Sequence, residues 1–302
     1  MRNLLYFTSI IFLLLVPTIC SGPTTYAIEP GDTSNTYKIK LVDNAVFIGT
    51  IIRQDSGMII MKTASLPKVE IPFKQIKSIE RIDRKDVVAG TYWFPNPNAT
   101  RYLFSTSAFS LKKGEGYYQN TYLFLNSFNV GVTDNISLGG GLEFISTFAS
   151  LATGNFDPIF FITPKFGFEI TEKVHAGGGL IYASIPGFDG DDRTGFGILY
   201  GIGTYGSIDH NITGGIGWGY TDSQLADQPF LTLSATTRIA RKASLVTENW
   251  FIPNGHEYYN IYSYGVRFFG ESISVDLAFL INQDIAEAIS LGIPYVDFVI
   301  KF

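Results

Sequence analysis

Residues Ile293–Phe302 at the end of the chain read IPYVDFVIKF. Apolar and polar side chains alternate along this stretch. The apolar positions are Pro294, Val296, Phe298, Ile300 and Phe302, and the residues between them include Tyr295, Asp297 and Lys301. Because successive side chains of a strand point to opposite faces, this alternation predicts a β-strand with one apolar and one polar face.

The aromatic residue Phe302 closes this strand. The stretch resembles the C-terminal signature strand of bacterial outer-membrane β-barrel proteins, whose terminal aromatic residue is read by the barrel assembly machinery. The resemblance implies that Tyr295, Phe298, Ile300 and Phe302 form the assembly signal and that this machinery is a partner. It also implies that the apolar face contacts outer-membrane lipid and that the polar face lines a lumen.

The start of the chain predicts export. Arg2 is followed by the almost wholly apolar stretch 4–16, which Pro17 ends, and a small-residue cleavage site lies at 25–27. This pattern is typical of a signal peptide over residues 1–27, and the apolar stretch is too short for a membrane helix. Cys20 raises the alternative of a lipoprotein signal. Cys20 is also the only cysteine, so the mature chain has no disulfide.

Composition narrows the class of protein. Of 302 residues, 46% are hydrophobic and 15% aromatic. Beyond the signal, no apolar run approaches the roughly 20 residues of a membrane helix. Barrel strands spread apolar residues over alternate positions, so they account for this composition. The formal net charge of −5 argues against nucleic acid partners. The alternative is a secreted soluble β-protein.

Residues 37–83 form a separate unit after a short N-terminal segment, 28–36. Five short predicted strands with tight turns at 43–44 and 55–57 indicate a small β-barrel. Their spacing resembles that of Sm-like small β-barrels. We expect this unit to lie in the periplasm and to bind a protein partner, because its basic residues are interleaved with acidic ones and do not favour RNA.

Residues 84–100 predict a linker, and residues 101–302 predict an antiparallel transmembrane β-barrel. Tight connections centred on 134, 172, 210, 241 and 270 alternate strictly with longer ones at 112–116, 149–157, 186–194, 222–228, 253–257 and 284–292. Outer-membrane barrels have short periplasmic turns and longer extracellular loops, so these connections predict about twelve strands, an even number. The chain is thus expected in the outer membrane of a Gram-negative bacterium, with its N-terminal unit in the periplasm.

Charged residues mark the lumen face of the predicted strands, because a charge facing lipid is costly. The predicted lumen set comprises Glu143, Lys165, Glu169, Arg238, Glu248, Arg267, Asp276, Asp297 and Lys301. We expect Lys165, Arg238 and Arg267 to lie near Glu143, Glu169 or Asp276, since buried charges need partners or water. A wall of small residues is predicted at Gly139, Gly141, Gly177, Gly179, Gly197, Gly201, Gly203, Gly215, Gly217 and Gly219. The lumen is either a narrow polar conduit or a plug of ion pairs.

Signals for an enzyme are weak. An outer-membrane lipid-processing enzyme needs a serine activated by a histidine at the outer rim. Of the histidines, only His256 falls in a predicted extracellular loop, and no serine is tied to it. The sequence predicts no catalytic residues, no metal site and no cofactor. The leading hypothesis is a non-enzymatic barrel that acts as a narrow channel or as an envelope scaffold.

Overall fold

The computed structural model describes residues 35–302, except 84–85, 89–90, 153, 155, 188–192, 222–223 and 256. The predicted signal peptide, Cys20 and residues 28–34 lie outside the described residues. The chain divides into two compact units between Trp93 and Phe94. Among the described residues, no helix is both long and apolar enough to span a membrane.

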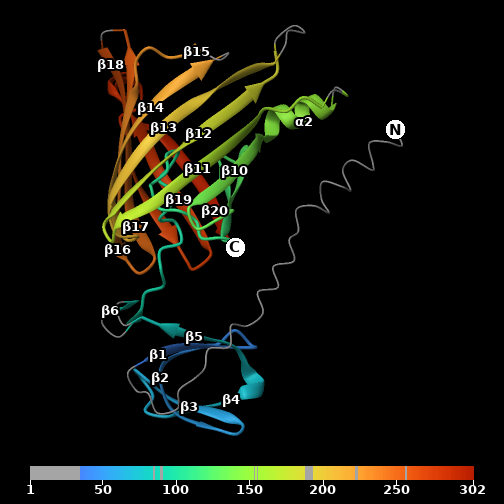
Figure 1. Cartoon of the computed structure of the whole chain (residues 1–302), viewed down its shortest axis with the longest axis vertical. Helices are drawn as coiled ribbons and strands as arrows, with labels where there is room; N and C mark the ends of the chain where they lie inside the picture. The colour runs from blue at the N-terminus through green and yellow to red at the C-terminus, as the bar shows by residue number, and fades with distance from the viewer. Residues whose placement is uncertain are drawn as a thin grey trace. The chain divides into compact units, whose positions relative to one another are not determined.

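The N-terminal unit is built on a five-stranded antiparallel sheet in the order β4-β3-β2-β1-β5 (Figure 1). The strands are β1 (Thr36–Leu41), β2 (Val46–Asp55), β3 (Met58–Thr63), β4 (Val69–Pro72) and β5 (Ile76–Ile82), with a 3-10 turn η1 (Phe73–Gln75) before β5. A short hairpin of β6 (Val87–Val88) and β7 (Thr91–Tyr92) follows. Ile39, Ile51, Ile59 and Met61 are almost fully buried in its core. The resemblance to Sm-like barrels stays a prediction.

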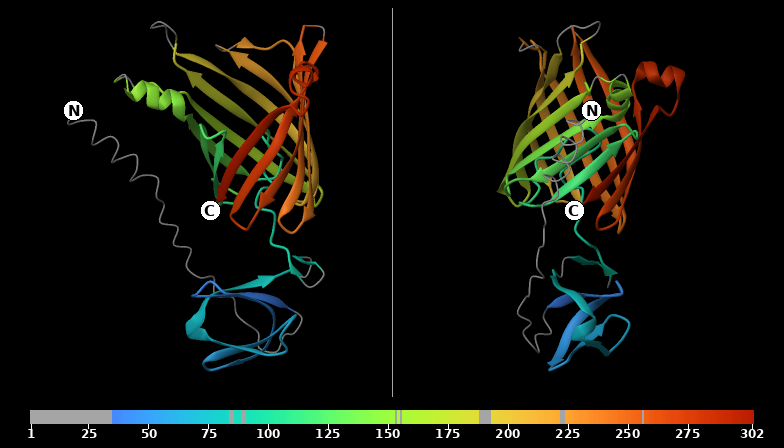
Figure 2. Two further views of the ribbon diagram at one scale, coloured as in Figure 1. Left: turned by 180° about the vertical axis from the view of Figure 1, so that it is seen from behind. Right: turned by 90° about the vertical axis from the view of Figure 1, so that its right-hand side faces the viewer.

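The second unit is a closed antiparallel barrel (Figures 1 and 2). Among the described residues its sheet has thirteen strands, of which β15 (Gln224–Leu225) is a two-residue addition to β14. The other twelve close the ring, because β20 pairs with β8 and β13 pairs with β14. They are β8 (Gly116–Thr121), β9 (Leu125–Gly131), β10 (Ile136–Glu143), β11 (Phe160–Thr171), β12 (Val174–Ile185), β13 (Thr194–Gly206), β14 (His210–Thr221), β16 (Phe230–Ala240), β17 (Ala243–Asn254), β18 (Glu257–Phe269), β19 (Ile273–Ile281) and β20 (Ile293–Lys301). The predicted closed antiparallel barrel and its strand number are confirmed.

Most connections at the two barrel ends differ in length, as predicted. Two predicted long connections are wrong: β17 and β18 are joined by only residues 255–256, and residues 112–115 precede the first wall strand, β8, near the end of β20. The strand pairs β11–β12 and β16–β17 are joined by two-residue turns, whereas connections at the opposite end include helices α2 (Phe144–Ala152) and α3 (Gln283–Ala288). Each helix starts on a side chain that accepts backbone N–H groups, which otherwise lack partners in the first helical turn. Glu143 accepts from Ile145 and Ser146, and Asn282 accepts from Ile285 at 2.7 Å.

The wall of the barrel begins at Gly116 and not at the predicted Arg101. The stretch predicted as the second strand is in fact the hairpin β8–β9. Its turn places Tyr122 and Leu123 at φ of 55° and 71°, a left-handed conformation that favours glycine or asparagine. The turn therefore carries no recognisable sequence signal. One predicted strand is absent and another is split, so the two differences cancel in the strand number.

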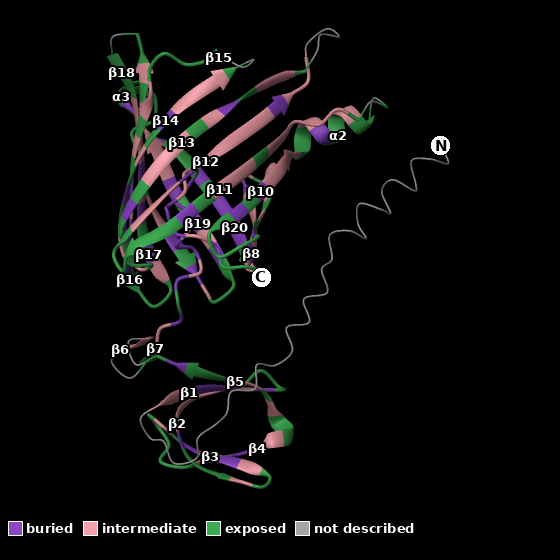
Figure 3. Ribbon diagram, in the orientation of Figure 1, coloured by how far each residue is buried: buried purple, intermediate pink, exposed green. Residues whose placement is uncertain are grey.

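Buried residues alternate with more exposed ones along barrel strands such as β19 and β20, as the colours of the ribbon in Figure 3 indicate. Leu277 and Val296 lie opposite each other and are 50% and 41% exposed, whereas the adjacent pair Asp276 and Asp297 is 1% exposed. Of the predicted assembly residues, Phe298 and Ile300 pair with the outward-facing residues Val275 and Ile273, so they also face outward. Tyr295 is buried inside the barrel. Phe302 exchanges backbone hydrogen bonds with Gly116 at 2.9 Å, and these bonds close the β20–β8 seam.

Glycines on the inner face lie beneath aromatic rings. A Cβ atom on Gly141 or Gly217 would lie 2.4 Å from the ring of Phe161 or Phe230, and one on Gly179 would lie 2.6 Å from the Tyr200 hydroxyl. The predicted glycine wall is wrong at Gly197, which shares the outward register of Leu199. It is also wrong at Gly201 and Gly203, where a Cβ would meet open space. These two residues pair with Ile216 and Gly214 on the outer face. Alternation alone misassigned them, since glycine carries no hydrophobic signal.

Candidate functional site

Residues Phe94–Leu111, here called the inner segment, fold inside the barrel (Figures 1 and 2). The side chains of Tyr102 and Ala108 are fully buried, and Leu103 is 3% exposed. Pro95 and Pro97 cannot donate a backbone hydrogen bond, so they disfavour pairing in a sheet. The segment instead bonds to itself, with Asn98 N–H donating to Asn96 Oδ1 and Ser107 Oγ donating to the Ala99 carbonyl. The predicted linker therefore ends at Trp93, since residues 94–100 belong to the barrel unit.

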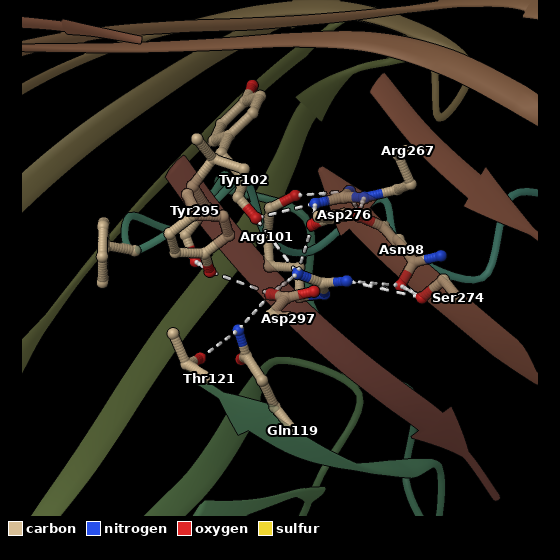
Figure 4. Close-up of polar contacts among 12 residues, drawn as sticks. Asn98, Arg101, Tyr102, Gln119, Thr121, Arg267, Ser274, Asp276, Tyr295 and Asp297 are labelled. Carbon is tan, nitrogen blue, oxygen red and sulfur yellow. Dashed lines mark hydrogen bonds and ion pairs between the residues drawn. The ribbon is translucent and has the colours of Figure 1, made fainter. Parts of the chain in front are cut away.

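Arg101 and Arg267 share two buried carboxylates (Figure 4). Nη1 of Arg101 lies 2.9 Å from Asp276 Oδ2 and 2.8 Å from Asp297 Oδ2. Arg267 donates to both oxygens of Asp276 at 2.6 Å. All four side chains are at most 4% exposed. Two cations thus balance two carboxylates, which offsets the cost of removing each charge from water.

The arginine cluster also fixes the backbone of the inner segment. Arg267 donates to the carbonyl oxygens of Asn98, Arg101 and Tyr102, the last at 2.7 Å. Tyr295 donates to the Leu103 carbonyl at 3.0 Å. Side chains of strands β18 and β20 therefore hold successive peptide groups of one turn.

Arg101 stays charged in this cluster, although burial alone lowers its pKa. The carboxylates of Asp276 and Asp297 oppose burial and leave the pKa above its ordinary value. Burial raises the pKa of the Tyr102 hydroxyl to about 12. This hydroxyl therefore stays protonated and can donate at 2.6 Å to Asn211 on β14.

Glu248 receives backbone N–H groups instead of a cation. Its carboxylate accepts from Leu103, Phe104 and Ser105, with the bonds from Leu103 and Ser105 at 2.9 Å. The Trp250 indole N–H donates to its other oxygen at 2.7 Å. Glu248 is 2% exposed, so these donors replace its lost hydration. Because the N–H groups of three successive residues bond to the same carboxylate, Glu248 holds this turn of the inner segment in place.

Arg238 and Lys165 contact the two ends of the inner segment through groups other than the predicted Glu143, Glu169 and Asp276. Arg238 donates to the Phe94 carbonyl at 2.9 Å and to Asp209 at 3.0 Å, and its guanidinium lies over the Phe94 ring. Lys165 Nζ donates at 2.7 Å to Thr106 Oγ1 and to the Phe109 carbonyl. Of these partners, Phe94, Thr106 and Phe109 lie in the segment that the sequence predicts as linker and wall, and Asp209 lies in the turn between β13 and β14.

The remaining predicted lumen charges lie away from this cluster. Glu143 caps helix α2. Glu169 is exposed near the end of β11 with His175 3.9 Å away, and Lys301 Nζ lies 3.4 Å from Glu115. Among the described residues, no group of three or more His, Cys, Asp or Glu is placed to hold a metal ion.

Sequence reasoning missed Arg101, Tyr102 and the inner segment as a whole. One signal pointed to them, because the predicted lumen set held more carboxylates than cations. A buried excess of carboxylates requires a further cation. Arg101 at the predicted start of the wall is the residue that supplies it.

No protein-family model and no curated protein matches the chain. Solved structures with a similar fold include the NanC porin, with 8% identity over 62% of this chain and 96% of that one, at a TM-score of 0.37. Outer membrane phospholipase A from Escherichia coli has 8% identity over 69% and 97% of the two chains, at 0.34. OmpT of Vibrio cholerae, with loop L8 deleted, has 12% identity over 89% and 96%, at 0.31. These values are too low to transfer an activity to this chain.

Proposed function

We propose that the chain is a non-enzymatic integral outer-membrane barrel. The support is the apolar outer face, where large side chains such as Phe166, Leu233 and Leu277 are 51%, 44% and 50% exposed. A water-soluble protein rarely leaves apolar surface of this extent uncovered, whereas lipid covers it at no cost. The secreted soluble alternative is therefore disfavoured. Outer-membrane lipid is the expected neighbour of this face.

The barrel acts as a closed envelope scaffold that tethers its N-terminal unit to the membrane. The observation that carries this proposal is the contact of Glu248 with the N–H groups of Leu103, Phe104 and Ser105, which holds the inner segment inside the barrel. The buried cluster of Arg101 reinforces it. Of the two predicted alternatives for the lumen, a plug fits these contacts better than an open conduit. The N-terminal unit is proposed to face the periplasm and bind a protein partner there.

A gated channel is the second candidate. Within the described residues, the inner segment contributes no strand to the wall, and its one isolated bridge joins Arg101 to Thr106 of the same segment. The closed ring of strands therefore does not depend on backbone pairing with this segment. If the segment moved, the barrel would keep its wall and gain an open lumen.

The test is planar-bilayer conductance of the refolded full chain and of Glu248→Gln. A glutamine retains one acceptor oxygen and adds donors that face the N–H groups of the segment. We expect the unmodified chain to be silent and Glu248→Gln to show discrete openings. Glu143→Gln is the matched control, because Glu143 caps α2 and, among the described residues, forms no hydrogen bond or ion pair with the inner segment. It should stay silent.

Large, steady conductance of the unmodified chain would overturn the closed scaffold in favour of an open conduit. If neither variant conducts, the closed-scaffold proposal stands and the gated-channel proposal is wrong.

A further inference from the structure

A cavity of about 220 Å³ lies inside the barrel, between the inner segment and the wall. A single buried water needs only about 15 Å³ on such a scale, so the cavity has room for a small molecule. The inner segment contributes Arg101, Leu103, Phe104, Ser105 and Thr106 to its lining. The folded inner segment therefore encloses part of the cavity, which adjoins the arginine cluster at Arg101.

Part of the cavity lining is apolar. Ile181 on β12 and Ile198 on β13 lie opposite each other in register, and Ile202 continues this surface. Phe161, Phe230 and Trp250 complete it. Lumen-facing positions of outer-membrane barrels are usually polar. An apolar surface inside the barrel matches the interior of a ligand pocket.

Another part of the lining is polar, and two of its hydroxyl groups have no hydrogen-bond partner among the described residues. Gln119, Ser127, Asn129 and Thr163 lie there. Tyr117 and Tyr200 also line the cavity, Tyr200 from β13 between Ile198 and Ile202, and neither hydroxyl makes a hydrogen bond with any residue that the structure describes. Such groups are available to a bound molecule or to water.

The described lining of the cavity holds cationic side chains and no carboxylate, although the Glu248 carboxylate bonds to lining residues that include Ser105 and Trp250. The cationic side chains are those of Arg101 and Lys165. Asp276 and Asp297 neutralise Arg101. Lys165 contacts only neutral oxygens, those of Thr106, Phe109 and Thr100. A buried ammonium without a counter-ion favours an anion beside it.

We propose that this cavity binds a fatty acid, a single-chain amphiphile with a carboxylate head. The head pairs with Lys165, which can form a charge-assisted hydrogen bond to it. The chain lies along Ile181, Ile198 and Ile202. A carboxylate head supplies the anionic partner that the described contacts of Lys165 lack.

The test uses Trp250 as an internal reporter. A protein with Trp93→Phe and Trp218→Phe keeps Trp250 as its only tryptophan. It is placed in phosphatidylcholine vesicles and titrated with a terminally brominated dodecanoic acid, whose bromine quenches nearby indole fluorescence. The matched control keeps only Trp218, which pairs with outward Leu199 and so reports fatty acid dissolved in the bilayer.

We expect saturable quenching of Trp250 and non-saturating quenching of Trp218. Lys165→Met should weaken the binding of the acid roughly tenfold. The brominated alcohol of equal length should bind the unsubstituted cavity about as weakly as the acid binds Lys165→Met. This comparison needs no variant at Lys165, so it tests the proposal even if that variant fails to fold. Quenching of Trp250 that parallels Trp218, or equal binding of acid and alcohol, would overturn the proposal.

Discussion

At the residue scale, the strongest determinants of the closed barrel are side chains that meet the inner segment. Arg267 contacts Asp276 through two hydrogen bonds and also binds three carbonyl oxygens of the segment. One side chain therefore joins the wall to the segment. Its loss would remove both the ion pair and the backbone contacts.

Arg267→Ala should lower the free energy of unfolding by about 3 kcal/mol, because it leaves Asp276 with Arg101 as its remaining cation. The measurement is denaturant unfolding of the refolded barrel in lipid vesicles. Lys301→Met is the control, because Lys301 and Glu115 are 26% and 41% exposed. Exposed pairs contribute about 1 kcal/mol or less. Equal stability of Arg267→Ala and the unsubstituted chain would indicate that water fills the lumen, and it would contradict the proposal that the inner segment closes the barrel.

At the element scale, strand β19 shows how alternation specifies the membrane face. Its outward residues run from Ile273 at one end through Leu277 at the centre, and they are 51% and 50% exposed. Both have apolar neighbours across the strand pair, Ile300 and Val296. The two positions differ mainly in their depth in the bilayer.

Leu277→Arg should destabilise the barrel by about 2–4 kcal/mol, and Ile273→Arg by about 0–1 kcal/mol, because the cost of a charge on the lipid face depends on depth. Unfolding in vesicles measures both. The two variants serve as each other's control for exposure and strand. Equal costs at the two positions would argue against a membrane around this strand.

At the scale of the whole molecule, the division between Trp93 and Phe94 separates two units with their own interiors. Ile39, Ile59 and Met61 are fully buried in the N-terminal unit. The inner segment, in contrast, finds its contacts within the barrel unit, such as Arg238 with Phe94. A cut at this division should leave both parts intact.

Residues 35–93 expressed alone should be soluble and β-rich by circular dichroism. A chain that starts at Phe94 should insert into vesicles and remain silent in conductance, because it keeps the inner segment. A chain that starts at Lys112 lacks that segment and should conduct. An unfolded 35–93 fragment would show that the first unit needs the rest of the chain, and a silent chain from Lys112 would show that something else closes the barrel.

The sequence by itself determined the barrel, because a period-two pattern is local and reports which face meets lipid. Ile293–Lys301 and Ile273–Ile281 are strands with the predicted outer face. The same pattern predicted an inward position for Arg267 and Asp276. The face of each side chain can be predicted from its sequence neighbours alone, because successive side chains of a strand point to opposite faces.

Only the tertiary structure decided what fills the lumen. Residues 94–111 have no strand pairing, and their partners are distant in the chain, with Asp276 and Asp297 lying 175 and 196 positions from Arg101. No local period can report such contacts. The β8–β9 turn was hidden for a related reason, since Tyr122 and Leu123 adopt a left-handed conformation that their residue types do not favour. The turn joins two strands that are paired in the barrel wall, so its position is known only from the tertiary structure.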